Sequence, residues 1–429
     1  MKLFRNVLIS LLFVFIVQKS QAQSFPLNLL GPSAEVTIPF EYHQGFIVVD
    51  IIFQKMVPLR FILDTGAENT ILLKKEYAVM MNMTYQKKIQ LLGSDMSKPI
   101  FAYICNGSFL QLANTQTVRH NIIVLEEEHL FLEEYLGTKV DGILGAEFIK
   151  GHILRIDYKR YNIVLSDPKK YDFDRLNKYH KYDIEIINSK PYLNCVTEVI
   201  SGHPTNTKLL LDTGAGLSAM FHNNTDTLLD LPAQIVKGSL GKGLGGEIEG
   251  FSGKIHQLTI GKLKFTNMIS SFQDLDELYI KPDKVVRNGL LGNVLFERFD
   301  IVFDLANSKL YLDPKKNYNK DFEFDKSGMT IFAFGKNLDQ YYVKYVLKDS
   351  PAFESGIFSG DIITKVGCWS RRWFTLRQLN KKFIGKTGKK VKITIKRNNV
   401  DLKKTIVLRD LFIAAPLKSD ILNPQIEEN

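Results

Sequence analysis

An internal repeat constrains the fold of this chain more than any other feature of its sequence. The segment Phe-Ile-Leu-Asp-Thr-Gly-Ala at residues 61–67 returns as Leu-Leu-Leu-Asp-Thr-Gly-Ala at residues 209–215, an offset of 148 residues (212 − 64). The segment Asp-Gly-Ile-Leu-Gly at residues 141–145 returns as Asn-Gly-Leu-Leu-Gly at residues 288–292, an offset of 147 residues (292 − 145). Matches at a nearly constant offset are typical of a duplicated structural unit. We therefore predict two copies of one domain within the chain.

Each copy has the pattern of a β domain. Short runs of β-branched and aromatic residues alternate with Gly, Asn, Asp and Lys, which is typical of strands joined by turns. Helical turns are expected only at residues 147–150 and 294–299, directly after the two glycine motifs. The sequence thus predicts a mainly β fold, with lobe 1 at residues 27–170 and lobe 2 at residues 175–316. The copies differ enough to favour an asymmetric site within one chain, so we expect a monomer.

The first 22 residues have the pattern of a secretory signal peptide. Lys2 and Arg5 precede an apolar run over residues 7–17, and small residues from Ser20 to Ala22 suit cleavage. An uncleaved anchor is the alternative, but the run is shorter than the ~20 residues that span a bilayer. We expect export, to the periplasm or to the exterior, of a mature chain with no integral membrane segment.

The cysteines and histidines offer little for metal binding or for a disulfide framework. Three cysteines are too few for such a framework, and most are expected to be buried as small apolar side chains. A disulfide between Cys105 and Cys195 stays open. Zinc-binding spacings of His and Cys do not occur, so we expect no metal and no cofactor.

The net charge of +10 is unevenly distributed. Residues 321–410 contain 19 Lys or Arg against 9 Asp or Glu. Such an excess is typical of a solvated basic face, and attraction to acidic peptides or to an anionic surface is the alternative. A nucleic-acid-binding motif does not accompany it, so we expect no nucleic-acid partner.

The two Asp-Thr-Gly turns contain the candidate catalytic residues. An apolar strand that runs into Asp-Thr-Gly places a carboxylate at a tight turn, where Gly permits the close approach of a second segment. If the copies pack about a pseudo-twofold axis, Asp64 and Asp212 face each other. Two such carboxyls cannot both ionise easily, so they share one proton. The ionised one activates a water as general base, and the protonated one polarises the carbonyl of a peptide bond.

With these motifs the chain resembles the pepsin–retropepsin class of aspartic peptidases, particularly the bacterial two-lobed retropepsin-like form with a C-terminal PDZ domain. The resemblance covers residues 35–316 and implies two acid-protease β-barrels that hydrolyse a peptide or protein substrate. It implies catalytic roles for Asp64 and Asp212, supporting roles for Thr65, Gly66, Ala67, Thr213, Gly214 and Ala215, and bracing roles for Gly145 and Gly292. The exchange of Asp141 for Asn288 keeps the apolar and glycine positions of the bracing segment, so we expect activity to survive it.

A glycine-rich segment of lobe 2 is the candidate flap, the hairpin that closes over the substrate in this class. Gly243, Gly245 and Gly246 suit a mobile tip, about 30 residues after the second Asp-Thr-Gly. A phosphate-binding loop is excluded, because Gly243 follows Lys242 where such a loop needs Ser or Thr. A plain surface loop is the remaining alternative. The matching segment of lobe 1 is residues 93–95, and neither tip has the tyrosine of pepsin-like flaps.

Residues 321–410 resemble a bacterial PDZ domain and leave a tail at residues 411–429. The expected elements are a strand at residues 341–347, a Ser-Pro-Ala turn with a short helix, Gly-Asp-Ile-Ile at residues 360–363, a helix near residues 375–383, and strands at residues 390–396 and 405–408. The resemblance implies that a C-terminal peptide ligand adds as a strand beside Gly328, Met329, Thr330 and Ile331. Packing against the lobes without peptide binding is the alternative.

Two classes of function follow. The first is an exported aspartic endopeptidase whose PDZ-like domain binds a substrate or partner peptide. The second is a non-catalytic peptide-binding or scaffold protein with the same folds. Both intact Asp-Thr-Gly turns favour the first. A Ser/His or Cys/His hydrolase lacks support, because no Gly-x-Ser-x-Gly segment occurs and the 8 His do not cluster.

Overall fold

A computed structural model describes residues 35–92, 99–127, 132–244, 246–274 and 287–414. The expected signal peptide at residues 1–22, the lobe-1 tip at residues 93–95 and the tail from residue 415 lie outside these ranges. Within them the chain is mainly β, as predicted. In that described part, no helix has both the length and the apolar character needed to span a bilayer.

Lobe 1 is an eight-stranded sheet with three short helices. Its strands are β2 (Glu41–His43), β3 (Phe46–Phe53), β4 (Val57–Asp64), β5 (Ile71–Leu72), β6 (Tyr85–Leu92), β7 (Pro99–Leu112), β8 (Val118–Leu125) and β9 (Gly142–Gly145). Its helices are α1 (Lys75–Met80), α2 (Leu132–Leu136) and α3 (Ala146–Ile149). The strand order is β2-β3-β4-β9-β5-β8-β7-β6.

Lobe 2 has the corresponding arrangement. Its strands are β13 (Glu185–Ile187), β14 (Lys190–Glu198), β15 (Pro204–Leu211), β16 (Ala219–Phe221), β17 (Gln234–Gly243), β18 (Gly246–Ile260), β19 (Leu263–Phe272) and β20 (Gly289–Leu291). Short helices are η2 (Asn223–Thr225), η3 (Thr227–Leu229) and α4 (Asn293–Phe296). The order β13-β14-β15-β20-β16-β19-β18-β17 matches that of lobe 1 strand for strand, and β29 (Ile413–Ala414) adds to β17 at the edge.

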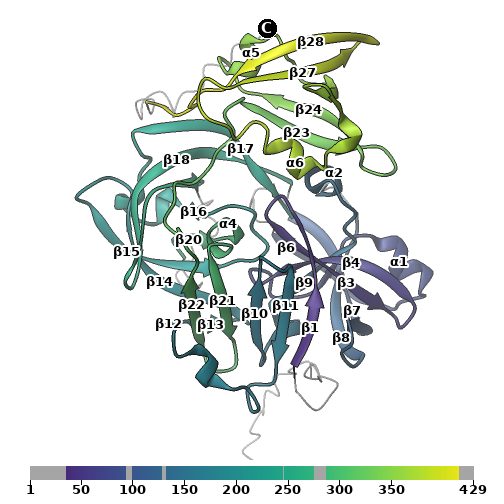
Figure 1. The fold of residues 1–429 in the computed structure, drawn as a ribbon. Coiled ribbons are helices and arrows are strands. Elements are labelled where there is room, and N and C mark those ends of the chain that lie inside the picture. Colours follow the sequence, from purple (N-terminus) through teal and green to yellow (C-terminus); the bar gives the residue numbers. More distant parts are fainter. Residues whose placement is uncertain (1–34, 93–98, 128–131, 245, 275–286, 415–429) are drawn as a thin grey trace, which may run out of the picture.

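A six-stranded sheet joins the lobes. It contains β1 (Glu35–Pro39), β10 (Ile153–Asp157), β11 (Asn162–Ser166), β12 (His180–Asp183), β21 (Phe299–Asp304) and β22 (Lys309–Pro314), with η1 (Phe173–Leu176) before β12. Its order is β1-β11-β10-β21-β22-β12, so β10 of lobe 1 pairs antiparallel with β21 of lobe 2 (Figure 1). The expected helix at residues 294–299 ends at Phe296, because the chain enters β21 at Phe299.

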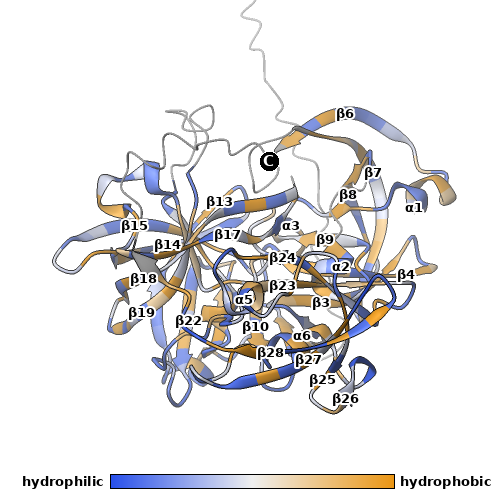
Figure 2. Cartoon of the chain, turned by 90° about the horizontal axis from the view of Figure 1, so that it is seen from above, coloured by the Kyte–Doolittle hydropathy of each residue, from blue (hydrophilic) through white to orange (hydrophobic). Residues whose placement is uncertain are grey.

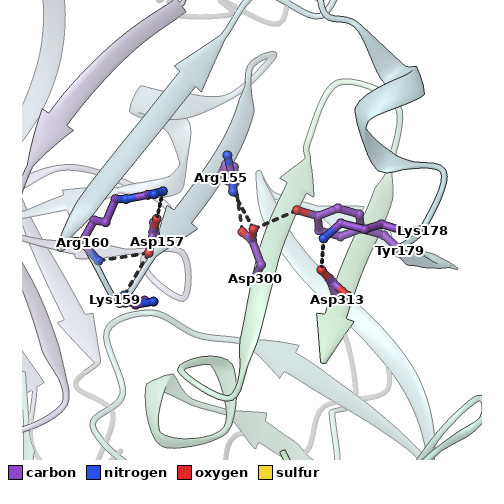
Figure 3. Close-up of polar contacts among 8 residues, drawn as sticks. All are labelled: Arg155, Asp157, Lys159, Arg160, Lys178, Tyr179, Asp300 and Asp313. Atoms are coloured by element: carbon purple, nitrogen blue, oxygen red, sulfur yellow. Dashed lines mark hydrogen bonds and ion pairs between the residues drawn. The ribbon is translucent and has the colours of Figure 1, made fainter. Parts of the chain in front are cut away.

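Ion pairs cross this joining sheet (Figure 3). The Arg155 guanidinium on β10 donates to both carboxylate oxygens of Asp300 on β21, at 3.0 and 2.5 Å. The Tyr179 hydroxyl donates to the same carboxylate at 2.9 Å, and Lys178 donates to Asp313 at 2.6 Å. The lobes are therefore held together by backbone pairing and by a bidentate ion pair.

The apolar core extends through both lobes. A single cluster of buried side chains includes Phe53 of lobe 1, Phe303 of the joining sheet and Phe221 of lobe 2. Figure 2 shows hydrophobic and hydrophilic residues mixed along the same strands, as expected where one face of a sheet is buried. Cys105 and Cys195 are buried and free, and Cys368 is exposed and free, so the disulfide hypothesis is wrong.

The C-terminal domain forms its own sheet and core. Its elements are β23 (Met329–Phe334), β24 (Gln340–Val346), β25 (Ile362–Val366), β26 (Trp369–Ser370), β27 (Lys390–Arg397), β28 (Val400–Val407), α5 (Pro351–Glu354), η5 (Arg371–Trp373) and α6 (Leu376–Asn380). The strand order is β23-β24-β25-β27-β28, and β26 pairs with β25. Ser350 caps α5 with Pro351 at its first position, and Thr375 caps α6 by a reciprocal capping box with Gln378.

Two boundaries in this domain differ from the expectation. The last strand begins at Val400, not at residue 405, because its polar residues alternate outward along a strand at the edge of the sheet. The expected helix over residues 375–383 is shortened to Leu376–Asn380. Figure 1 places the domain beside α2 of lobe 1 and the β17–β18 hairpin of lobe 2.

Candidate active site

The two Asp-Thr-Gly turns begin where β4 and β15 end. Each of these strands pairs in parallel with its bracing strand, so that Asp64 lies opposite Gly145 and Leu211 lies opposite Leu291. A Cβ on Gly145 would lie 2.5 Å from the Asn69 backbone, and one on Gly292 would lie 2.4 Å from the Leu217 carbonyl oxygen. Both bracing glycines are therefore required by a close backbone approach.

Four reciprocal hydrogen bonds between the lobes hold the turns together. The Thr65 hydroxyl donates to the Leu211 carbonyl at 2.6 Å and accepts from the Thr213 N–H at 3.0 Å. The Thr213 hydroxyl donates to the Leu63 carbonyl at 2.9 Å and accepts from the Thr65 N–H at 3.0 Å. Both threonines are fully buried. The pseudo-twofold pattern expected of the threonines is therefore present in the structure.

The structure brings the carboxyls of Asp64 and Asp212 together. Asp64 Oδ1 accepts from the N–H groups of Gly66 at 2.7 Å and Ala67 at 2.9 Å, and Asp212 Oδ1 accepts from the Gly214 N–H at 2.7 Å. A Cβ on Gly66 would lie 2.6 Å from the Asp212 carboxyl carbon, and one on Gly214 would lie 2.2 Å from that of Asp64. Each glycine thus makes room for the carboxyl of the opposite turn.

The electrostatics of the pair are asymmetric. Burial raises the pKa of Asp212 well above its usual range, and the negative charge of Asp64 raises it further. Burial also raises the pKa of Asp64, against the opposing effects of the Ala67 N–H, the hydrogen bond with Asp212 and the Gly66 N–H. Since Asp64 accepts two backbone N–H bonds and Asp212 accepts one, the shared proton is favoured on Asp212.

Three residues that the sequence reasoning missed affect the site. Asn293 Nδ2 donates to the carbonyls of Thr213 at 2.6 Å and Gly45 at 2.7 Å, and so ties the second Asp turn to a lobe-1 hairpin. The positive charges of Arg287 and Lys190 lower the pKa of Asp212 and Asp64, respectively, although burial has the larger effect. Asn293 takes the place of Ala146 in the repeat, and this difference between the copies could have drawn attention to it.

The candidate flap is the hairpin of β17 and β18. Gly243 lies opposite Gly246, whereas Gly245 is outside the described residues. Leu244 packs against an apolar cluster of lobe 1 that also includes Ala67. Leu240 and Ile248 pack in a cluster of lobe 2 that also includes Ala215. The hairpin thus packs against apolar clusters of both lobes, and each of these clusters also includes the alanine of an Asp turn.

The candidate peptide-binding residues of the C-terminal domain lie away from the Asp pair. Gly328 has a positive φ of 77°, and Met329, Thr330 and Ile331 begin β23, the edge strand of that sheet. Helix α6 contacts β23, as the resemblance implies, but α2 of lobe 1 contacts it as well. Among the described residues, no group of three His, Cys, Asp or Glu side chains is suited to a metal ion.

Parts of this chain are similar to known proteins. The aspartic proteinase from Irpex lacteus aligns over 67% of this chain and 100% of its own, with 14% identity and a TM-score of 0.43. No curated protein matches the chain. Residues 196–295 match the family model described as aspartyl protease. The matched residues contain Asp212, its Thr-Gly-Ala turn and the bracing Gly292.

Proposed function

We propose that this chain is an exported aspartic-type endopeptidase in which Asp64 and Asp212 act as one catalytic pair. The reciprocal hydrogen bonds of Thr65 and Thr213 carry this proposal, because they hold the two carboxyls in one site. The aspartyl protease match over residues 196–295 supports it independently. The matching strand orders of the two lobes support a duplicated acid-protease fold.

The arrangement of the pair suits a water-mediated hydrolysis. Asp64 is the better-stabilised carboxylate and removes a proton from a water, while Asp212 donates its proton to the carbonyl oxygen of the peptide bond. The water oxygen bonds to the carbonyl carbon and gives a neutral tetrahedral diol. In the collapse of this diol the C–N bond breaks, Asp64 returns a proton to the leaving nitrogen, and Asp212 recovers one from a hydroxyl.

The C-terminal domain is proposed to be PDZ-like and to bind the C-terminus of a substrate or partner peptide. Its support is the separate core, the α5 helix capped by Ser350, and β23 at the edge of the sheet beside α6. Addition of a strand at such an edge is the usual mode of PDZ recognition. Binding of a fluorescent peptide with a free carboxylate, compared with its amidated form, tests this role. Equal binding of both, or of neither, contradicts it.

The main test is hydrolysis of a mixed peptide library by residues 23–429, from pH 3 to pH 8. Asp64→Asn and Asp212→Asn should each abolish cleavage, and a statine-containing peptide should inhibit the wild type. Asp183→Asn is the matched control, because this side chain is 86% exposed and pairs only with Lys309 among the described residues. If a folded wild type cleaves nothing, or if either Asn variant keeps full activity, the proposal fails and the scaffold alternative is favoured.

A further inference from the structure

The lobe-2 hairpin contacts the C-terminal domain as well as the apolar clusters of both lobes. The Tyr345 hydroxyl on β24 donates to Glu247 Oε2 on β18. The Lys242 ammonium, directly opposite Glu247 in the hairpin register, lies over the Phe332 ring of β23 at 5.2 Å from its centroid. Two adjacent positions of the hairpin are thus held by two adjacent strands of another domain.

Helix α2 of lobe 1 completes a three-way contact. The Tyr135 ring meets the Phe332 ring edge-on, with 5.6 Å between centroids, and the Tyr342 hydroxyl donates to Glu134 Oε2 at 3.1 Å. A Cβ on Gly241 of the hairpin would lie 3.5 Å from the Tyr135 hydroxyl oxygen. The β23–β24 surface formed by Phe332, Tyr342 and Tyr345 therefore holds lobe 1 through α2 and lobe 2 through its hairpin.

This contact is partly removed from solvent. Tyr135 and Lys242 are not exposed, and burial lowers the pKa of Lys242 while Glu247 raises it. Burial, followed by the hydrogen bond with Glu247, raises the pKa of Tyr345 to about 12. Tyr345 itself is 38% exposed, so its hydrogen bond with Glu247 lies at the solvent-accessible side of the contact. The cation–π contact of Lys242 is partly shielded from water and is stronger for that reason.

The same hairpin also packs against lobe 1. Leu244 near its tip packs against the lobe-1 apolar cluster to which Ala67, three residues after Asp64, also belongs. The hairpin is therefore held at its sides by the C-terminal domain and near its tip by the lobe-1 apolar cluster. Displacement of Tyr345 or Phe332 would remove the contacts at its sides.

We propose that the C-terminal domain positions the hairpin for catalysis, with Tyr345 and Phe332 as positioning residues that act through Glu247 and Lys242. This inference rests on the proposed function, with the hairpin acting as the candidate flap of that peptidase. A domain that holds the hairpin increases the fraction of molecules ready to bind substrate. Loss of the contacts between the domain and the hairpin lowers this fraction. Apparent substrate binding then weakens in proportion, while the Asp pair is unaltered.

The first experiment measures the hairpin itself. Hydrogen exchange at residues 241–248 is followed in the full chain with the Asp64→Asn change, so that no cleavage interferes. Tyr345→Phe, Lys242→Met and Glu247→Gln should each accelerate exchange there by about fivefold, as expected for the loss of one stabilising polar contact. Tyr341→Phe is the matched control: it lies on the same strand, and its hydroxyl donates to the Phe374 carbonyl within the domain at 2.6 Å.

The second experiment uses the best-cleaved peptide of the library with the active chain. Tyr345→Phe should raise KM by about threefold with kcat within about twofold, while Tyr341→Phe changes neither. The Tyr345→Phe and Glu247→Gln double variant should be no worse than Tyr345→Phe alone, because phenylalanine has no hydroxyl to donate to residue 247. The proposal is overturned if hydrogen exchange in the hairpin is unchanged in Tyr345→Phe, Lys242→Met and Glu247→Gln. It is also overturned if Tyr341→Phe accelerates this exchange as much as Tyr345→Phe does. If the wild type cleaves nothing, the proposed function fails while the exchange experiment still decides whether the domain holds the hairpin.

Discussion

Thr65→Val removes one hydroxyl from the contact between the lobes and leaves the side-chain volume nearly unchanged. The hydroxyl makes two hydrogen bonds, to the Leu211 carbonyl at 2.6 Å and from the Thr213 N–H at 3.0 Å, and the residue is 0% exposed. Valine makes neither bond, so two backbone groups lose a partner where water does not reach. Each such loss costs about 1–3 kcal/mol, and the free energy of unfolding should fall by about 2–6 kcal/mol.

Guanidinium unfolding followed by fluorescence measures this loss in the Asp64→Asn background, where the chain cannot digest itself. Thr213→Val should lower the free energy of unfolding by the same amount, because the Thr213 hydroxyl also donates one hydrogen bond and accepts one. Thr65→Ser keeps the hydroxyl and should cost less than about 1 kcal/mol. Thr387→Val is the surface control, since Thr387 is exposed, and should stay within about 0.5 kcal/mol of the parent.

A loss below about 1 kcal/mol for Thr65→Val would refute the reasoning, because the two buried groups would then have found other partners. An equal loss in Thr65→Ser and Thr65→Val would also refute it, because serine keeps the hydroxyl and its two hydrogen bonds. In the active chain, Thr65→Val should lower kcat more than it raises KM. The reason is that the turn, and not the candidate flap hairpin, is the part that moves.

Three further predictions concern the same site and the joining sheet. Gly214→Ala should lower kcat by at least about 100-fold, because the added Cβ would lie 2.2 Å from the Asp64 carboxyl carbon, whereas Gly238→Ala, with open space at its Cβ, should not. Asp212→Asn should raise the free energy of unfolding at pH 7 and leave it unchanged near pH 3. The folded chain keeps a proton that the unfolded chain releases above a pKa of about 3.9, so stability falls as the pH rises through the raised pKa of the pair. Urea unfolding at both pH values measures this, and a gain at pH 3 as large as at pH 7 would contradict it. Asp300→Asn should cost about 1 kcal/mol through its half-buried pair with Arg155, and a cost no larger than that of Asp183→Asn would show that the ion pair contributes nothing.

The candidate site could be predicted from sequence because it lies within the repeat. The apolar strand, the Asp-Thr-Gly turn and the bracing glycine are local patterns, and their duplication predicts that they meet about an axis. The structure contains these contacts, down to the threonine that reaches across from each copy. Residues with one role in both copies are therefore visible from the sequence.

The rest depends on contacts between segments that share no pattern. Tyr158 donates to Asn293 at 2.6 Å across 135 residues of sequence, and nothing local to either residue predicts this. The packing of α2 against β23 is another contact that could not be predicted, because neither segment has a sequence pattern that indicates its partner. The start of β28 was missed because an edge strand exposes polar side chains where a central strand would not.

The joining sheet has a consequence for the order in which the chain can fold. Its central pair combines β10 with β21. The ion pair of Arg155 therefore cannot form until Asp300, 145 residues further along the chain, has been synthesised. During synthesis from the N-terminus, lobe 1 leaves the ribosome with that edge open and with Thr65 lacking its partner. Contacts at such long sequence separation form late and slowly. A nascent chain that ends before Asp212 thus holds only one carboxyl of the pair, and the candidate site is complete only after the second half has been synthesised.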